Sequence, residues 1–200
     1  MTTHLLFPTL VFEDTLSHLQ KHNQHFIDKA YNLQKQYPAV DNGWRCDTYN
    51  TLNQYYPNQD NDPAVQELIQ ECGKRVLGFS SEWGVTSDKI NCIDFWINIA
   101  KPGDYQEYHN HPNSHFSLAY YVKTAPDCGN ITYKSLDSIA DMYSLPIVKA
   151  ETPAAFGTYS FVPEPNKLLI FRSNLLHMVE KNKSNEDRIS ITMNFKFDNV

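Results

Sequence analysis

The chain has 200 residues, of which 41% are hydrophobic and 13% are aromatic. A chain of this length can bury one substantial core, so we expect a single domain over residues 1–200. The formal net charge is −6, which gives no overall attraction for nucleic acid and disfavours a nucleic-acid partner. No stretch approaches the roughly 20 apolar residues of a membrane-spanning helix, so we expect no membrane association.

The cysteines and the first residues indicate the compartment. The four cysteines include no CxxC pair, which favours reduced thiols over a zinc knuckle or a disulfide framework. The first residues, MTTHLLFPTLVFEDTL, lack the basic region and the cleavage site that are typical of a signal peptide. We therefore expect a cytoplasmic protein.

Helical patterns dominate residues 1–90, which we interpret as a support region. The first predicted helix runs over about Asp14–Gln36, where one apolar stripe contains Leu19, Phe26, Ala30, Leu33 and Tyr37. The second predicted helix begins at Asp62-Pro63, an N-cap followed by proline in the first turn. Between the two, Pro38–Pro57 is typical of a loop with a short strand, and Asn42-Gly43 marks a turn.

Extended patterns replace the helical ones from about residue 90. The predicted strands are Cys92–Ala100, Tyr105–His109, Phe116–Lys123, Gly129–Lys134, Leu168–Phe171 and Arg188–Phe197. Proline- and glycine-containing turns separate several of them. Short strands of this kind indicate a small antiparallel barrel or sandwich.

Polar and apolar residues alternate strictly in the last predicted strand. Its polar positions are Arg188, Ser190, Thr192, Asn194 and Lys196, and its apolar positions are Ile189, Ile191, Met193, Phe195 and Phe197. A solvated outer face is the simpler explanation of the polar positions. Alternatively, the apolar face packs on the N-terminal helices and the polar face lines the mouth of a barrel. Helices on one face of an antiparallel sheet define an α+β arrangement.

Three of the eight histidines, His109, His111 and His115, lie within the segment GDYQEYHNHPNSHFSLAYYV. Residues i and i+2 of a strand point to the same side, so His109 and His111 could converge on one ion. His177 follows a separate apolar strand and could supply the third ligand of a facial site with open positions. Taken by itself, the H-x-H pair is more simply explained as two polar histidines in a turn. When His177 and Arg188 are considered with it, a metal site is the better explanation.

Arg188 and Ser190 share the polar face of the last predicted strand. A buried arginine is costly unless it meets an anion, and its planar fork suits a carboxylate. Ser190 could donate a further hydrogen bond to the same anion. Taken alone, Arg188 is more simply explained as a surface residue paired with Glu186 or Asp187.

These residues resemble the pattern of the 2-oxoglutarate/Fe(II) oxygenase superfamily, in which an H-x-ligand pair and a distant His precede Arg-x-Ser on the last strand. The chain is also similar to a small group of oxygenases, defined by sequence, in marine bacteria and their phages. The segments that carry this likeness are FPTLVF, Asn42-Gly43-Trp44, WINIAKPGDYQEYHNHPNSHFSLAYYVKT and KLLIFRSNLLHMVEKNKSNEDRISITMNF. The likeness is good from about Trp96 to Phe197. It implies an α+β fold with a double-stranded β-helix (jelly-roll, cupin-like) core over residues 91–200 and the N-terminal helices packed on one sheet.

The resemblance also implies a cofactor set and a role for each site residue. Fe(II) would be bound by His109, His111 and His177, and 2-oxoglutarate would be the co-substrate. Arg188 would hold the distal carboxylate of 2-oxoglutarate, and Tyr121 would support that carboxylate. Asn98 would face the metal end of the co-substrate. The implied activity is that of a dioxygenase that oxidises an unidentified substrate.

The departure from the superfamily is His111, which stands where an Asp or Glu ligand is usual. His111 would complete a three-histidine site, or Asn110 or water would fill the position, or the ligand set would shift to include His115. Imidazole ligands alone also suit Zn or Ni.

Three other functions compete with the oxygenase. The first is a catalytically idle module that binds metal and 2-oxoglutarate, which the missing carboxylate favours. The second is a three-histidine cupin-like dioxygenase without 2-oxoglutarate, which Arg188 and Ser190 disfavour. The third is a structural or partner-binding protein. The sequence leaves open whether two copies pair through an exposed edge strand to form a homodimer, because the hydrophobic pattern does not show which strands lie at the sheet edges.

Two further segments each have a functional and a structural interpretation. Residues 135–165 form a long insertion, either a lid over the substrate site or a surface loop with a short helix over Ser138–Tyr143. His18, His22 and His25 lie on one side of the first predicted helix. Although an i, i+4 pair can bind zinc or nickel, we interpret that face as solvated.

Overall fold

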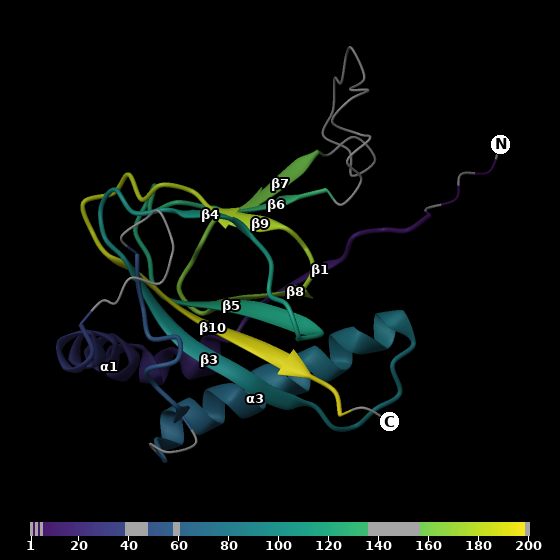
Figure 1. Cartoon of the computed structure of the whole chain (residues 1–200), viewed down its shortest axis with the longest axis horizontal. Helices are drawn as coiled ribbons and strands as arrows, with labels where there is room; N and C mark the ends of the chain where they lie inside the picture. Colours follow the sequence, from purple (N-terminus) through teal and green to yellow (C-terminus); the bar gives the residue numbers. More distant parts are fainter. Residues whose placement is uncertain are drawn as a thin grey trace, which may run out of the picture.

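The computed structural model describes residues 2, 4, 6–38, 48–57, 61–135 and 157–198. In this part of the chain, ten strands form two antiparallel sheets, and two α-helices lie on one side of them (Figure 1). The helices are α1 (Asn23–Gln36) and α3 (Pro63–Ser80), and short 3-10 helices cover Ser17–His22 and Ser81–Trp83. The strands are β1 (Val11–Thr15), β2 (Tyr49–Asn50), β3 (Asn91–Ala100), β4 (Gln106–His109), β5 (Phe116–Lys123), β6 (Ile131–Lys134), β7 (Thr158–Phe161), β8 (Lys167–Arg172), β9 (His177–Val179) and β10 (Arg188–Lys196).

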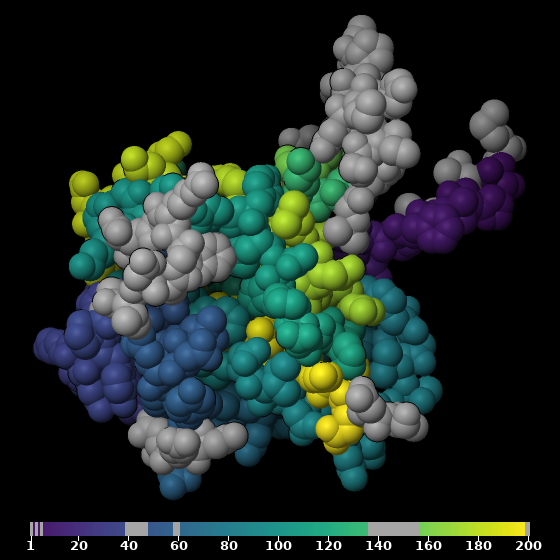
Figure 2. Space-filling view, in the orientation of Figure 1, coloured from purple at the N-terminus to yellow at the C-terminus, as the bar shows by residue number. Residues whose placement is uncertain are grey.

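The two sheets form the walls of a double-stranded β-helix, as predicted. The larger sheet has the order β1-β8-β5-β10-β3-β2, and the smaller sheet has the order β4-β9-β6-β7. Both helices lie beneath the larger sheet, and the smaller sheet lies on the opposite side (Figure 1). The segment before β1 leads away from the body of the molecule (Figures 1 and 2).

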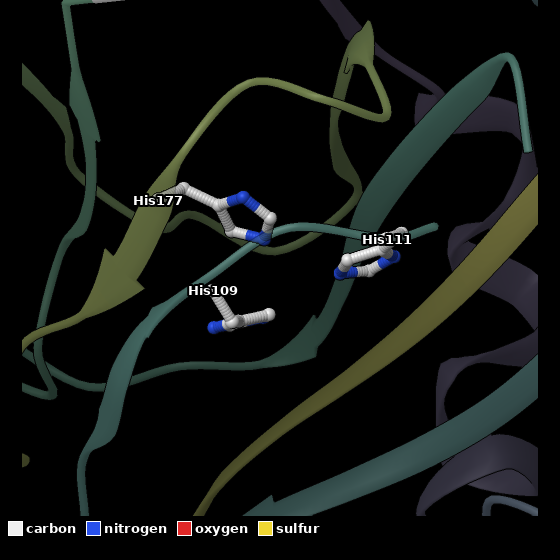
Figure 3. Close-up of side chains that lie close together, drawn as sticks. All are labelled: His109, His111 and His177. Atoms are coloured by element: carbon white, nitrogen blue, oxygen red, sulfur yellow. The ribbon is translucent and has the colours of Figure 1, made fainter. Parts of the chain in front are cut away.

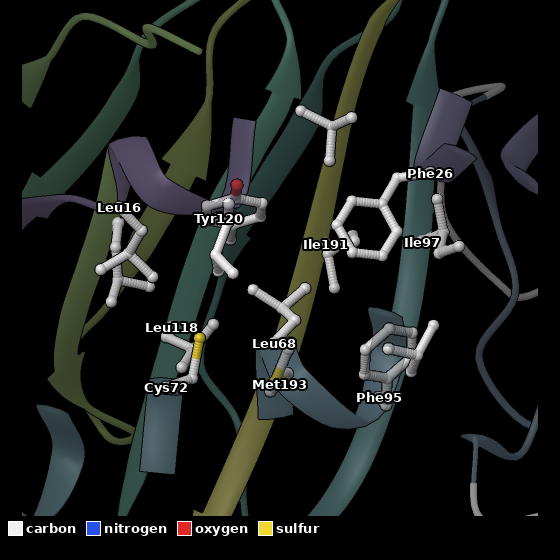
Figure 4. Close-up of a cluster of buried hydrophobic side chains, with 14 of the residues drawn as sticks. Leu16, Phe26, Leu68, Cys72, Phe95, Ile97, Leu118, Tyr120, Ile191 and Met193 are labelled. Carbon is white, nitrogen blue, oxygen red and sulfur yellow. The ribbon is translucent and has the colours of Figure 1, made fainter. Parts of the chain in front are cut away.

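The main core lies between the helices and the larger sheet. The apolar face of β10 contributes Ile191 and Met193, which pack with Phe26 of α1 and Leu68 of α3 (Figure 4). A second, smaller core lies between the two sheets and includes Phe171. Of the two explanations offered for the alternation in β10, the second holds, because its apolar face is buried against the helices and its polar face turns toward the other sheet.

Helix α3 begins where its sequence predicts. The Asp62 Oδ1 atom accepts hydrogen bonds from the backbone N–H groups of Ala64 and Val65, at 3.0 and 3.4 Å. Pro63 occupies the first helical position, where a missing N–H has no cost. Among the described residues, no helix has the length and apolar composition needed to cross a membrane.

The prediction of one helix over Asp14–Gln36 was wrong at its start. Residues Val11–Thr15 form β1, which pairs with β8 at the edge of the larger sheet, and α1 begins only at Asn23. The hydrogen bonds of β1 go to a strand more than 150 residues away, so they leave no trace in the local pattern. Tertiary pairing overrides the helical periodicity here.

The predicted insertion also contains regular structure at its end. Residues Thr158–Phe161 form β7, which pairs with β6 in the smaller sheet. Residues 136–156 of the predicted lid, which include Ser138–Tyr143, lie outside the described residues, as does the Asn42-Gly43 turn.

Candidate metal and co-substrate site

Three histidines meet at one end of the smaller sheet (Figure 3). His109 ends β4 and is the direct register partner of His177, which begins β9. His111 lies two residues after His109, in the turn that follows β4. Its backbone N–H donates to the carbonyl oxygen of Ser173 at 2.8 Å, which holds this turn in place. Strand pairing thus brings together residues from two distant parts of the chain.

The geometry of the three rings suits a single ion. Each histidine offers one ligand nitrogen, and these nitrogens all lie within 4.8 Å of one another. The ring centroids are 4.3 Å apart for His109 and His177, 5.1 Å for His111 and His177, and 5.3 Å for His109 and His111. Among the described residues, this is the one group of three or more potential ligands that lie so close together.

Each ring is oriented by an oxygen that accepts at Nδ1. His109 donates to the carbonyl of Glu107 at 2.7 Å, and His177 donates to the carbonyl of Leu175 at 2.9 Å. His111 lies 2.6 Å from the Oδ1 atom of Asn194. A proton on Nδ1 leaves the lone pair on Nε2, which is the form of imidazole that binds a metal.

Burial keeps these imidazoles neutral. Loss of hydration lowers the pKa of His111 to about 4. Burial lowers the pKa of His177 well below its usual value, and the neighbouring histidines lower it further. The pKa of His109 is lowered by burial as well. Metal ligands must be deprotonated at their donor atom, so the site is ready for a cation at neutral pH.

His115, the predicted alternative ligand, lies elsewhere. Its Nδ1 atom accepts a hydrogen bond from the backbone N–H of Phe197 at 3.1 Å, and its ring stacks on that of Phe197. Asn110 is exposed on the rim of the pocket that contains the other three histidines. The geometry therefore favours His111 over His115 as the third member of the cluster.

The histidine cluster opens into a pocket of about 470 Å³ between the two sheets. All seven residues of the predicted site line it: Asn98, His109, His111, Tyr121, His177, Arg188 and Ser190. Apolar side chains of the inner faces, including Ala119, Ile131 and Phe171, line it as well. A pocket of this kind binds small molecules through a few polar groups on an apolar wall.

Arg188 is buried in this pocket without a carboxylate partner among the described residues. Its side chain is only 3% exposed, and Nη1 donates to the carbonyl oxygens of Cys128 and Gly129 at 2.9 and 2.8 Å. Glu186 pairs with Lys123, and Asp187 accepts from Tyr31, so neither acts as the surface partner considered above.

The remaining donors of Arg188 are available to a ligand. Neither Nε nor Nη2 has a hydrogen-bond partner among the described residues. Burial lowers the pKa of Arg188 from its ordinary value, yet a guanidinium stays protonated in proteins. A buried cation of this kind is costly unless an anion meets it.

The other predicted co-substrate residues form one row across the larger sheet. Ser190 of β10 is the register partner of Asn98 on β3 and of Tyr121 on β5. Direct cross-strand partners share a face of the sheet, so all three side chains point into the pocket beside Arg188. Burial raises the pKa of Tyr121 to about 12, which keeps its hydroxyl protonated as a hydrogen-bond donor.

Two buried polar atoms near the site have no partner within the described part of the protein. They are the Oδ1 atom of Asn98 and the hydroxyl of Tyr133, whose ring lies 5.9 Å from that of His177. Buried polar groups are nearly always satisfied. The Tyr133 hydroxyl could donate to an oxygen of a ligand beside the histidines, whereas the Asn98 Oδ1 atom accepts and needs a donor such as water. The three imidazoles and the unused donors of Arg188 fit a metal and an oxygen-rich co-substrate.

The sequence interpretation missed several residues around the site. Asp94 and Trp96 of β3 and Asn194 of β10 line the pocket, and Tyr133 faces His177 from β6. The alternation of β10 placed Asn194 on the polar face, and that was the only available signal. Neutral amides also line the pocket: Asn50, Asn53, Gln106, Asn110 and Asn113.

The fold and the site together define a double-stranded β-helix protein with a three-histidine candidate metal centre. Residues 94–194 match the family described as "Putative 2OG-Fe(II) oxygenase". This match covers half of the chain, and the chain belongs to that family. Fe(II) and 2-oxoglutarate are the cofactors that the family's description names. No curated protein sequence matches the chain significantly.

Solved structures share the fold at low sequence identity. A Pseudomonas putida prolyl-4-hydroxylase is 13% identical, with a TM-score of 0.65 over 94% of this chain and 92% of the other. A collagen prolyl hydroxylase of Paramecium Bursaria Chlorella virus-1, in complex with 2-oxoglutarate, is 14% identical, with a TM-score of 0.60 over 92% and 94%. HygX of Streptomyces hygroscopicus, with nickel and 2-oxoglutarate bound, is 12% identical, with a TM-score of 0.61 over 94% and 83%. These likenesses confirm the double-stranded β-helix.

Proposed function

We propose that the protein is an Fe(II)- and 2-oxoglutarate-dependent dioxygenase that hydroxylates a substrate still to be identified. The observation that carries this proposal is one pocket that holds three converging neutral imidazoles and a buried arginine, to which the described part of the chain offers no carboxylate partner. The first group suits a divalent metal, and the second suits the carboxylate of a small acid. Family membership supports the same pairing.

Each residue of the pocket has a proposed role. His109, His111 and His177 bind the metal through Nε2, because their Nδ1 atoms are directed to oxygen acceptors. Arg188 binds the distal carboxylate of 2-oxoglutarate through its unused donors, and the hydroxyls of Ser190 and Tyr121 donate to the same carboxylate.

The remaining groups orient the co-substrate and keep the pocket dry. The Asn98 Nδ2 atom donates to the Thr192 hydroxyl at 3.0 Å, and Oδ1 of Asn98 has no partner among the described residues. Because an amide oxygen only accepts, it would contact the co-substrate through a bridging water. Ala119, Ile131 and Phe171 exclude water from the reacting groups. When bound, Fe(II) and 2-oxoglutarate couple O₂-dependent hydroxylation of a substrate C–H bond to conversion of 2-oxoglutarate into succinate and CO₂.

The test is the production of succinate from 2-oxoglutarate under air with added Fe(II), first without a prime substrate. We expect slow uncoupled turnover by the wild type, and none by His177→Ala or Arg188→Ala. His115→Ala is the matched control, since it removes a histidine of the same turn that does not join the cluster. Loss of turnover in the control together with the two site variants would contradict the assigned roles.

The competing functions predict different results for 2-oxoglutarate binding, succinate production and O₂ consumption. An idle module would bind 2-oxoglutarate in a metal- and Arg188-dependent way without making succinate in the presence of any substrate. A cupin-like dioxygenase would consume O₂ without a need for 2-oxoglutarate or Arg188. If the metal-loaded wild type bound no 2-oxoglutarate, the proposal would be wrong.

A further inference from the structure

His111 differs from the other two histidines in the group that orients it. Backbone carbonyls orient His109 and His177. A carbonyl oxygen can only accept, so it fixes the proton on Nδ1 without further help. His111 instead meets the side-chain amide of Asn194 at 2.6 Å. An amide can present either its oxygen or its NH₂ group, so some other group must determine which one faces His111.

Asp94, Asn194 and Ser117 form a second row across the larger sheet. Asn194 of β10 is the register partner of Asp94 on β3 and of Ser117 on β5. The Asn194 Nδ2 atom donates to Oδ2 of Asp94 at 2.8 Å, and Ser117 donates its hydroxyl to Oδ1 of Asn194 at 2.7 Å. Asn194 is buried, and Ser117 is fully buried.

The carboxylate of Asp94 determines the direction of every hydrogen bond in this row. An ionised carboxylate accepts only, so the NH₂ group of Asn194 must face Asp94 and its oxygen must face His111 and Ser117. With the amide reversed, two acceptor oxygens would meet at the 2.8 Å contact with Asp94. The NH₂ group would then face Nδ1 of His111, which would place the ring proton on Nε2, the nitrogen that must bind the metal.

We infer that Asp94 is a positioning residue for His111, acting through the Asn194 amide, and that it supplies from outside the ligand set the negative charge that an Asp or Glu ligand usually supplies within it. This inference rests on the proposed function, because it requires His111 to bind the metal. Carboxylates that orient metal-bound histidines have this effect in other sites. Here one amide is interposed between carboxylate and imidazole.

The test is the affinity of the apo-protein for Co(II), a spectroscopic substitute for Fe(II), titrated against a competing chelator with no substrate present. Asp94→Asn preserves shape but no longer forces the orientation of the Asn194 amide. We expect it to weaken Co(II) binding by roughly 10–100-fold and to change the visible spectrum of the bound ion. If Asp94 served only to contact substrate, neither quantity would change.

A double variant provides the rescue. Exchanging the two side chains, as Asp94→Asn with Asn194→Asp, places the carboxylate directly against His111 and lets the amide donate to it. We expect its Co(II) affinity to return to within a few fold of the wild type. Asp198→Asn is the matched control, because Asp198 accepts from the amide of Asn91 at 2.6 Å on the exposed end of the same sheet, and we expect no effect.

The outcomes separate this inference from the proposed function. Unchanged Co(II) affinity and spectrum in Asp94→Asn would overturn the inference, as would a folded double variant that binds no better than Asp94→Asn. Should Asp94→Asn fail to fold, the double variant alone decides, and weak binding by it counts against Asp94. Absence of Co(II) binding by the wild type, or equally tight binding by His177→Ala, would contradict the metal site itself.

Discussion

Gly129 connects the stability of the fold to the position of Arg188. It lies in the turn before β6 with a φ of +92°, and its carbonyl oxygen accepts from Nη1 of Arg188 at 2.8 Å. A Cβ atom at this position would overlap the backbone carbonyl of Glu180 and would lie 3.1 Å from Nη1 of Arg188. The backbone at Gly129 therefore lies so close to the Glu180 carbonyl and to the Arg188 guanidinium that a side chain at position 129 has no room.

Gly129→Ala should lower the free energy of unfolding for two reasons, backbone strain and steric overlap. Alanine at positive φ costs about 1–3 kcal/mol, and displacement of packed backbone costs about 1–3 kcal/mol more. The sum of about 2–6 kcal/mol is a large part of the roughly 5–15 kcal/mol that stabilises a typical domain. Since the Gly129 carbonyl must move, we also expect weaker 2-oxoglutarate binding through the displaced Arg188.

Gly103→Ala is the control variant, because it introduces the backbone strain of alanine at positive φ without the steric overlap. Gly103 has a φ of +99°, and the nearest group to an added Cβ is the flexible end of Lys181, at 3.9 Å. Urea denaturation of both variants, with 2-oxoglutarate binding measured on the metal-loaded proteins, gives the comparison. We expect Gly129→Ala to lose about 1–3 kcal/mol more than Gly103→Ala. Equal losses and unchanged 2-oxoglutarate binding would refute the reasoning.

Three further predictions concern the helices, the core and the metal. Asp62→Ala removes the cap of α3 and should lower the free energy of unfolding by about 1–2 kcal/mol. Burial alone would raise the pKa of Asp62, but hydrogen bonds from Lys29 and His25 outweigh it and hold that pKa far below its usual range. Because the pKa of Asp62 is lower in the folded than in the unfolded state, the ionised carboxylate stabilises the fold at pH values above its unfolded pKa of about 3.9. This stabilisation is lost as the pH falls toward the folded-state pKa, so the free energy of unfolding of Asp62→Ala should fall less on acidification than that of the wild type. Ile191→Ala truncates a fully buried side chain of β10 and should cost about 2–5 kcal/mol in urea denaturation. Ni(II) at 100-fold above its dissociation constant should stabilise the wild type by about 2.7 kcal/mol in thermal unfolding, and should not stabilise His177→Ala.

Each of these predictions has a contrary result. Parallel acid-denaturation curves for wild type and Asp62→Ala would show that the carboxylate does not act through its depressed pKa. A loss below about 1 kcal/mol for Ile191→Ala would be too small for a residue of the main core. Equal Ni(II) stabilisation of wild type and His177→Ala would place the metal elsewhere. The histidines of the first helical region are the obvious alternative, although the structure pairs them with the carboxylates of Glu71, Glu67 and Asp62.

The elements predicted well from the sequence are those whose burial imposes a long local pattern. Strand β5 has the predicted bounds, β3 and β10 differ from theirs by one residue at an end, and α3 starts at its predicted cap. In each, apolar residues recur with the period of the element over at least eight residues, because one face or both are buried. Strands β7 and β9, with four and three residues, are too short to show such a period.

The sequence by itself determined the parts of the site that lie on single strands. A period of two places Arg188 beside Ser190 on β10, whatever the partner strands are. The H-x-H spacing also keeps His109 and His111 near each other, although His111 lies in the turn after β4 and not on the strand itself. The sequence indicated His177 as the distant member of the cluster, and the register of β4 with β9 is what brings it beside His109. Tertiary structure alone decided that Asp94, Asn194 and Ser117 form one row, through the registers of β10 with β3 and β5. Those registers depend on pairing and packing between strands that are far apart in the sequence, which local sequence patterns do not encode.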